Sequence, residues 1–196
     1  CVKNFKPGDR IVAKPYVSCG ECYFCTSGLP QLCQKRLSIG IHRPGCFAEY
    51  TTIPEKSAIL VPEHVPDESA VMVEPLAIAL RIIKKAKSVI GKKIVILGAG
   101  TIGLLALILA KQAGAKGIVS DIFQEKLQLA SELGADITVN VTQKDLIEEV
   151  QNWSSGLGAD LAIETAGVSK TVEQAIKTVR PAGKVILAGL STELSK

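Results

Sequence analysis

The sequence predicts an α/β protein whose larger part is a doubly wound parallel sheet. Three observations predict this class. From Gly91 onward, short apolar runs alternate with longer segments of helical periodicity. A cluster of glycines directly follows the first of these apolar runs, as at a tight turn from a strand to a helix. Residues 1–66 differ, because prolines, glycines and cysteines separate short β-type runs there. We therefore expect two parts, residues 1–75 and residues 76–196.

The N-terminal part predicts irregular β structure followed by a connecting helix. The β-type runs are residues 10–13, 47–53 and 58–61, and prolines punctuate them. Asp67 offers an N-cap for the helical pattern that follows, and Pro75 suits the first turn of a helix that runs to about Lys87. The expected apolar face of this helix comprises Leu76, Ala79, Leu80 and Ile83.

The C-terminal part predicts five strands with four intervening helices. The expected strands are residues 94–97, 117–120, 137–140, 159–164 and 184–188. The expected helices are residues 101–113, 124–133, 143–153 and 169–179. Apolar strands that alternate with helices indicate a parallel sheet with right-handed crossovers and helices on both faces.

The glycine cluster predicts a dinucleotide-binding turn of the Rossmann type. The segment G-A-G-T-I-G is residues 98–103, and it joins the first strand to the first helix. The residues in it that we expect to bind the cofactor are Gly98, Gly100, Thr101, Ile102 and Gly103. Such glycines allow a tight turn, a close approach of the backbone to pyrophosphate, and close packing of helix on strand. The helix N-terminus then offers free N–H groups to the phosphates. The alternative is that the glycines only pack the helix on the sheet.

Two further segments of this part are expected to contact the cofactor. Asp121 ends the second strand, where a carboxylate accepts hydrogen bonds from a ribose hydroxyl. A carboxylate would also repel the additional phosphate of NADP, so the sequence favours NAD, although Asp121 could also be a solvated acid. The turn of Thr165, Ala166 and Gly167 follows the fourth strand, and we expect it to line the nicotinamide side because ligands bind beyond the carboxyl ends of such strands.

Four cysteines lie within residues 18–34 and predict a metal site. Their spacing is C-x2-C-x2-C-x7-C, formed by Cys19, Cys22, Cys25 and Cys33. An iron–sulfur site of the ferredoxin kind favours a shorter last gap followed by proline. A disulfide pair requires an oxidising compartment, which nothing in the sequence indicates. A tetrahedral zinc ion held by four thiolates fits best, and such a closed site is structural because no position is left for substrate.

Composition argues against two other classes of function. The net charge is +4 without a long basic block, and aromatic residues make up 4%, so nucleic-acid binding has no support. The apolar run 94–110 is short for a membrane span, and its glycines divide it into a strand and a helix. No signal peptide is recognisable in the first residues, and the chain lacks an initiator Met, so we expect a cytoplasmic protein of which this is an internal piece.

In these motifs the chain resembles the zinc-containing medium-chain alcohol/polyol dehydrogenases. FKPGDRIVAKP, the four-cysteine lobe, PGCFAEY, VEPLA and G-A-G-T-I-G occur in the order of that family and cover nearly the whole chain. The resemblance implies part of a GroES-like catalytic domain followed by a Rossmann NAD-binding domain. It also implies hydride transfer between an alcohol and NAD, a catalytic zinc distinct from the structural zinc, and a homo-oligomer, a dimer or a tetramer, in the full-length protein.

The resemblance also assigns roles to single residues. Glu74 matches the late ligand of the catalytic zinc, bound directly or through water, and it could instead be an acid that suits a helix N-terminus. The earlier ligands, a cysteine and a His-Glu pair, have no counterpart here. Lys126 matches a position that contacts the adenosine ribose, although a solvated lysine is the alternative.

Four further residues are weaker candidates. His42 could approach the substrate or relay a proton, or it could be an ordinary surface histidine. His64 is expected to be structural, Cys46 to be a small core residue, and Glu49 to support the substrate domain.

The leading hypothesis is therefore a zinc- and NAD-dependent dehydrogenase that acts on a polyol or a related secondary alcohol. EPLA resembles the polyol branch, whereas RPGCFAEY also resembles the L-threonine 3-dehydrogenase branch, which is the first alternative. A zinc-stabilised NAD-binding module without catalysis is another alternative, and we expect the isolated chain to be inactive. A reductase of the same superfamily that has lost the catalytic zinc, such as a quinone reductase, is disfavoured by the cysteine lobe and by Glu74.

Overall fold

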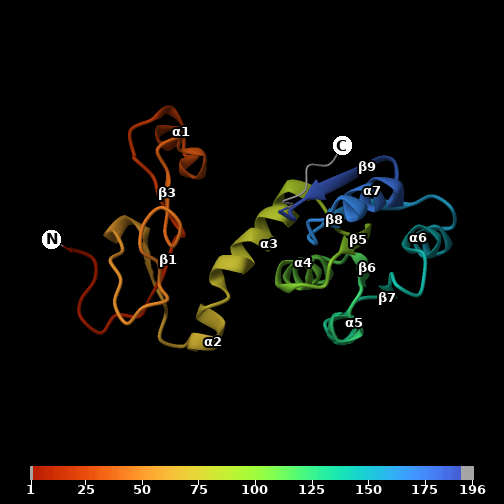
Figure 1. Cartoon of the computed structure of the whole chain (residues 1–196), viewed down its shortest axis with the longest axis horizontal. Coiled ribbons are helices and arrows are strands. Elements are labelled where there is room, and N and C mark those ends of the chain that lie inside the picture. The colour runs from red at the N-terminus through yellow and green to blue at the C-terminus, as the bar shows by residue number, and fades with distance from the viewer. Residues whose placement is uncertain (1, 191–196) are drawn as a thin grey trace. The chain divides into compact units, whose positions relative to one another are not determined.

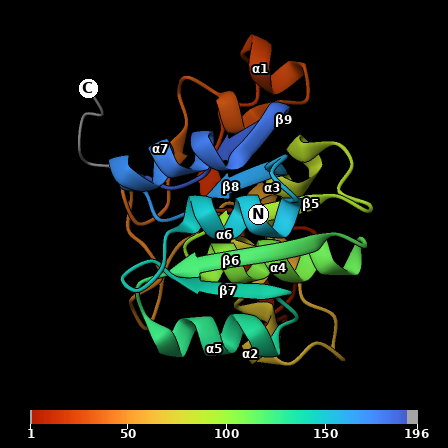
Figure 2. The same ribbon diagram turned by 90° about the vertical axis from the view of Figure 1, so that its right-hand side faces the viewer.

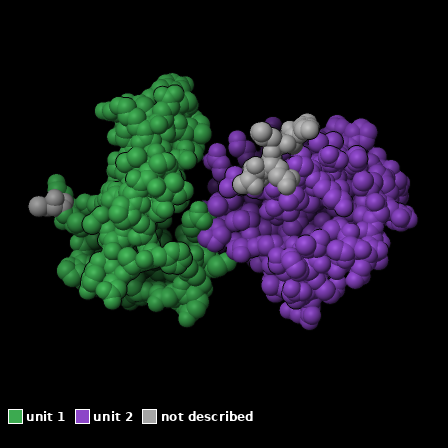
Figure 3. All heavy atoms as spheres, viewed as in Figure 1, with its two compact units in different colours: residues 1–74 green, residues 75–196 purple. Residues whose placement is uncertain are grey.

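The computed structural model describes residues 2–190 of the chain and divides it into two compact units. The first unit comprises residues 1–74 and the second comprises residues 75–196 (Figure 3). The last six residues of the predicted domain 76–196 lie outside the described residues. Each unit is described by itself.

The first unit consists of two small antiparallel sheets (Figure 1). Strand β1 (Ile11–Ala13) pairs with β4 (Ala58–Leu60), and β2 (Tyr16–Val17) pairs with β3 (Leu37–Ser38). The segment between β2 and β3 carries the four cysteines, helix α1 (Tyr23–Thr26) and the 3-10 helix η1 (Pro30–Leu32). The buried residues described in this unit are Cys33, Ser57, Val61 and Ala70. Such a small apolar core leaves the cysteine segment dependent on another source of order.

Two predictions for this unit are wrong. Residues 47–53 form bends and loop rather than a strand, and the 3-10 helix η2 (Glu55–Ser57) follows them. A β-type run is stable only with a partner strand, and none pairs with it among the described residues. Cys46 is exposed rather than buried, and it lines a cavity of about 680 Å³ within this unit.

The helical segment that follows has a break. Helix α2 (Asp67–Ala70) is separate from α3 (Val73–Ala86). Asp67 is the first residue of α2 rather than its N-cap, and its carboxylate pairs with the Arg10 guanidinium at 2.5 Å. The predicted apolar face of α3 is wrong in part, because Leu76 is 37% exposed and Leu80 is 41% exposed. The buried residues of α3 are Ala79, Ile82 and Ala86. Helix α3 belongs to the second unit from Pro75 onward. Its packing within the core of that unit, rather than periodicity alone, determines which of its residues are buried.

The second unit is the predicted doubly wound sheet of five parallel strands. The strands are β5 (Lys93–Leu97), β6 (Lys116–Asp121), β7 (Ile137–Asn140), β8 (Ala159–Glu164) and β9 (Val179–Leu187). Their spatial order is β7-β6-β5-β8-β9, which is the order 3-2-1-4-5 of dinucleotide-binding sheets. Strand β9 begins earlier than expected because Val179 pairs with Ala159 before a register shift brings Lys184 opposite Leu161.

Helices cover both faces of this sheet. Helices α4 (Thr101–Gln112) and α5 (Gln124–Glu132) pack on one face, and α6 (Leu146–Ser154) and α7 (Ser169–Thr178) on the other (Figures 1 and 2). Helix α6 begins later than predicted because Asp145 caps it, accepting hydrogen bonds from the N–H groups of Ile147 and Glu148. The apolar run 94–110 is strand β5 and helix α4. No helix within residues 2–190 has the length and apolar character to cross a membrane.

An ionic contact at the amino end of β8 makes the stability of this unit depend on pH. The Asp160 carboxylate accepts hydrogen bonds from the Lys93 N–H at 2.9 Å and from Arg180 Nε at 2.8 Å. Burial alone would raise the pKa of Asp160, but these donors outweigh it and hold the pKa below its ordinary value. A carboxylate whose pKa is depressed by folding stabilises the fold above its unfolded pKa of about 3.9, and this stabilisation is lost as the pH falls through the lower folded value.

Replacing Asp160 with asparagine is therefore expected to lower the free energy of unfolding by about 2 kcal/mol at pH 7. It should also reduce the loss of stability that the protein undergoes between pH 5 and pH 2, measured by urea denaturation. Glu173→Gln, at an exposed carboxylate of α7, is the control. If the free energy of unfolding of Asp160→Asn depended on pH as that of the unaltered chain does, the prediction would be wrong.

Candidate functional site

A cavity of about 400 Å³ lies at the carboxyl ends of four adjacent strands of the second unit, β7, β6, β5 and β8. It is at the point where the chain reverses its direction of progress across the sheet, between β5 and β8. Ligands of doubly wound folds bind at this point. The cavity is lined by Gly98, Gly100, Ser120, Asp121, Ile122, Phe123, Lys126, Val141, Thr165, Ala166, Val168, Thr171 and Gln174.

In the glycine turn, Gly98 and Gly103 are in close contact with neighbouring atoms, whereas Gly100 is not. A Cβ at Gly103 would lie 2.0 Å from the carbonyl oxygen of Gly98, so no larger residue fits. Gly98 has a φ of +104°, and a Cβ there would lie 2.8 Å from Thr165 Oγ1. Gly100 has an ordinary φ of −79°, and no atom lies within 4 Å of its Cβ position. Because Gly100 lines the cavity, its lack of a side chain leaves space for a ligand rather than for the protein.

The start of α4 presents unbonded donors beside this turn. Gly100 is the N-cap residue, and Thr101 and Ile102 form the first turn of the helix. The first N–H groups of a helix have no partner within it, and the helix dipole makes this end favourable for anions. The structure thus places Thr101 and Ile102 at the start of the helix that follows the glycine turn, where their side chains do not line the cavity, and their contact with a cofactor stays a prediction.

Asp121 is tied to the glycine turn and to its own loop. Its Oδ2 accepts a hydrogen bond from the Ala99 N–H at 2.8 Å. Its Oδ1 accepts hydrogen bonds from the N–H groups of Ile122 at 2.8 Å and Phe123 at 3.1 Å. Lys126, also at the cavity, places its ammonium 4.6 Å from the centre of the Phe123 ring. The carboxylate is thus fixed at the cavity with lone pairs left for a ligand.

The turn after β8 forms another part of the cavity lining. Thr165 Oγ1 lies 3.0 Å from the carbonyl oxygen of Leu97 and 3.1 Å from that of Gly98, to which it can donate. Thr165 and Ala166 line the same cavity as Asp121. Sequence reasoning missed Glu164, whose buried carboxylate bonds to this turn. The sequence offers only a weak signal for it, an acidic residue directly after the apolar residues 161–163.

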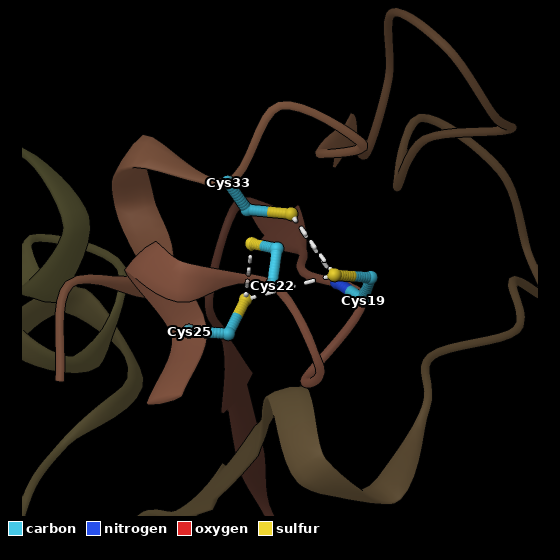
Figure 4. Close-up of side chains that lie close together, drawn as sticks. All are labelled: Cys19, Cys22, Cys25 and Cys33. Atoms are coloured by element: carbon cyan, nitrogen blue, oxygen red, sulfur yellow. Dashed lines mark hydrogen bonds between the residues drawn. The ribbon is translucent and has the colours of Figure 1, made fainter. Parts of the chain in front are cut away.

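The four cysteines of the first unit converge as a metal site (Figure 4). Their sulfur atoms all lie within 4.8 Å of one another. The separations include 3.5 Å for Cys22–Cys25, 3.6 Å for Cys19–Cys33 and 3.9 Å for Cys19–Cys25. Sulfur atoms 2.3 Å from a tetrahedral zinc ion would be about 3.8 Å apart, so the set fits zinc. The separations are too long for disulfides and leave too little space for a multi-iron cluster.

Two of these thiols differ in acidity. Backbone hydrogen bonds from Glu21 and Cys22 lower the pKa of Cys19 to about 6. Burial, together with the adjacent thiols, raises the pKa of Cys25 to about 11, although a backbone hydrogen bond from Gly20 acts in the opposite direction. Zinc binds thiolates, so Cys25 must release a proton when the ion binds.

The remaining candidates are not gathered into a site. Glu74 is exposed in the first turn of α3. Within residues 2–190, the four cysteines are the one group of three or more His, Cys, Asp or Glu residues close enough to share a metal ion. His42 is exposed, and its Nδ1 accepts a hydrogen bond from the Ser38 N–H. His64 and Glu49 are exposed. The roles of Glu74, His42, His64 and Glu49 stay predictions.

Comparison with known proteins gives a family match within each of the two units. Residues 1–63 match the model of the alcohol dehydrogenase GroES-like domain, and residues 101–196 match that of the zinc-binding dehydrogenases. The L-threonine 3-dehydrogenase of Pyrococcus furiosus is 36% identical over 190 residues, which are 96% of this chain and 54% of the relative. The chain thus spans about half the length of the curated relatives it matches.

Solved structures give the same result. Galactitol-1-phosphate dehydrogenase from Escherichia coli superposes with a TM-score of 0.92 at 33% identity, over 100% of this chain and 57% of that one. A Sinorhizobium meliloti 1021 protein solved with NADP bound has a TM-score of 0.92 at 36% identity, over 100% of this chain and 58% of that one. The chain belongs to the zinc-binding medium-chain alcohol dehydrogenase family, with a GroES-like first unit and a Rossmann second unit, as the sequence predicts.

Proposed function

We propose that this chain is part of a dehydrogenase that transfers a hydride between a secondary alcohol and NAD. The observation that carries the proposal is the cavity in which Asp121 is hydrogen-bonded to the glycine turn at the switch point of the sheet. In this arrangement the α4 N-terminus receives the pyrophosphate, Gly100 leaves space for its approach, and Asp121 accepts the ribose hydroxyls. Lys126, Thr165 and Ala166 complete the cofactor contacts.

The proposed cofactor is NAD rather than NADP. The Asp121 carboxylate occupies the position where the 2′-phosphate of NADP would lie, and its charge would repel that phosphate. Ile122 and Phe123, which follow it, offer no cation, and the Lys126 ammonium lies over the Phe123 ring. The S. meliloti protein was solved with NADP, so binding must be measured for both cofactors.

The proposed substrate is a polyol, with L-threonine as the second candidate. Support for the polyol comes from the EPLA segment at Glu74 and from the similarity to galactitol-1-phosphate dehydrogenase. Support for threonine comes from the L-threonine 3-dehydrogenases among the curated relatives. Both substrates are secondary alcohols with adjacent polar groups.

Two zinc ions have different proposed roles. The four cysteines would hold a structural zinc that orders the segment between β2 and β3. A catalytic zinc, with Glu74 as one ligand, would polarise the alcohol oxygen when bound. We further propose that the whole protein is a cytoplasmic homo-oligomer.

The cofactor assignment is tested by titrating NADH and NADPH into the chain. The unaltered chain is expected to bind NADH more tightly than NADPH. Asp121→Asn should weaken NADH binding about tenfold, because a charged acceptor is lost. It should also reduce the difference between the affinities for NADH and NADPH. Glu125→Gln, at an exposed carboxylate of α5 outside the cavity, is the control that should behave as the unaltered chain. Equal affinity of the unaltered chain for both cofactors would contradict the assignment.

The substrate assignment is tested with the whole protein. Polyols and L-threonine are offered at equal concentration with NAD, and NADH formation is followed by absorbance. Turnover of polyols supports the proposal, whereas turnover of threonine alone favours the second candidate. No turnover of any secondary alcohol would contradict the proposed activity.

A further inference from the structure

Glu164 is a buried carboxylate that the proposed function does not yet use. It ends β8, and the residue is 1% exposed. Its strand neighbours Leu161, Ala162 and Ile163 are apolar and buried. An ionisable group in such a position is costly unless it is well hydrogen-bonded. Its contacts therefore indicate why the position is acidic.

Three donors converge on one oxygen of this side chain. Glu164 Oε1 accepts hydrogen bonds from the Ala166 N–H at 2.8 Å and the Gly167 N–H at 2.7 Å, and the Thr171 hydroxyl, which can donate to it or to the Val168 carbonyl oxygen, lies 2.8 Å away. The first two donors belong to the turn after β8, and the third belongs to the first turn of α7. A single carboxylate oxygen thus joins the strand, the turn and the helix. Negative charge at this position also suits the N-terminus of α7.

The end of β9 encloses the same side chain. The Glu164 carbonyl oxygen accepts hydrogen bonds from the N–H groups of Ala188 at 2.8 Å and Gly189 at 3.0 Å. A Cβ at Gly189 would lie 2.6 Å from Glu164 Oε2 and 2.3 Å from the Gly167 nitrogen. The chain after β9 therefore passes directly against the carboxylate, which leaves little freedom for Glu164 to adopt another rotamer.

The groups that Glu164 holds line the cofactor cavity, whereas Glu164 itself does not. Ala166 and Thr171 bond to the carboxylate and line the cavity, together with Thr165 and Val168 of the same turn. We propose that Glu164 is a positioning residue that fixes this wall of the cavity for the dinucleotide. This inference rests on the proposed function, because it assumes that NAD occupies the cavity.

The proposal is tested by NADH binding to the full zinc-loaded chain. Glu164→Gln keeps the shape of the side chain but removes its charge, and it should weaken NADH binding about tenfold. Thr171→Val removes one of the three donors and should also weaken binding. If Thr171 acts through Glu164, the double variant should lose less affinity than the product of the two single losses.

The control is Asp160→Asn, at the opposite end of the same strand. Asp160 is also hydrogen-bonded, but to Lys93 and Arg180, and it does not line the cavity. Its replacement should lower the melting temperature while the dissociation constant of NADH stays unchanged. The comparison distinguishes a general loss of stability from a displacement of the cavity lining that Glu164 holds in place.

The outcomes distinguish the two proposals. If the unaltered chain fails to bind NADH, both the proposed cofactor site and the role of Glu164 are wrong. If it binds NADH and both Glu164→Gln and Thr171→Val bind equally well, only the role of Glu164 is wrong. Equal losses of affinity in Asp160→Asn and Glu164→Gln, at matched melting temperatures, would also overturn it. If Glu164→Gln does not fold, the NADH dissociation constant of Thr171→Val tests the proposed role of Glu164 instead.

Discussion

Replacing Gly103 with alanine is expected to abolish NADH binding and to lower the free energy of unfolding by about 3 kcal/mol. The added Cβ would lie 2.0 Å from the Gly98 carbonyl oxygen and 3.2 Å from its carbonyl carbon. These are backbone atoms, so the contact is relieved only if α4 moves away from the glycine turn. That movement would displace the helix N-terminus from the cavity. Urea denaturation and NADH titration measure the two effects.

Gly100→Ala is the matched variant, because the two glycines are separated by only two residues. No atom lies within 4 Å of the Cβ position of Gly100, and its φ is allowed for any residue. We expect the stability of Gly100→Ala to equal or exceed that of the unaltered chain. Its NADH binding should be weaker, because the methyl group would project into the cavity. A stable Gly103→Ala variant with unchanged affinity would show that the described turn is incorrect.

The second large effect is expected at the cysteine cluster. Cys33→Ser should lower the zinc affinity more than about 100-fold, because a thiolate ligand is lost from a closed tetrahedral site. Since the first unit buries few side chains, the segment between β2 and β3 should lose its order at the same time. We expect one zinc ion per chain before the substitution, measured by elemental analysis, and competition with a chelator gives the affinity.

Two further measurements make this prediction specific. Cys46→Ser, at an exposed cysteine outside the cluster, should leave zinc affinity unchanged. Zinc affinity should fall as the pH is lowered, because the Cys25 thiol, with a pKa of about 11, must lose its proton on binding. Below about pH 6 Cys19 is also protonated, so the decline should become steeper. Two zinc ions per chain, or retention of zinc by Cys33→Ser, would contradict the assignment.

The second unit could be predicted from the sequence more completely than the first. Strands β7 and β8 have the predicted bounds, because the central residues of a parallel strand covered on both faces are mostly apolar, as residues 161–163 of β8 are. In the first unit, residues 47–53 carry a β-type pattern without forming a strand, since pairing depends on partners that local sequence does not specify. The exposed Leu80 has the same cause, because periodicity gives the spacing of a face but not the surface that covers it.

The candidate site shows a similar division. Gly98, Gly103 and Asp121 could be selected from the sequence because each is required by a local turn at a known offset. Glu164 could not, because its significance depends on donors from the turn and the helix that converge only in the fold. The role of Glu74 depends on ligands that the described residues do not gather around it, and it stays a prediction.

The hydrogen bonds of Asp121 have a consequence for the thermodynamics of recognition. Its carboxylate is already held by Ala99, Ile122 and Phe123 without any ligand. The receptor for the ribose is therefore preorganised, and little side-chain entropy remains to be lost when a nucleotide arrives. Affinity at this position comes from groups that need not rearrange, which is how a single acid can discriminate between two cofactors that differ by one phosphate.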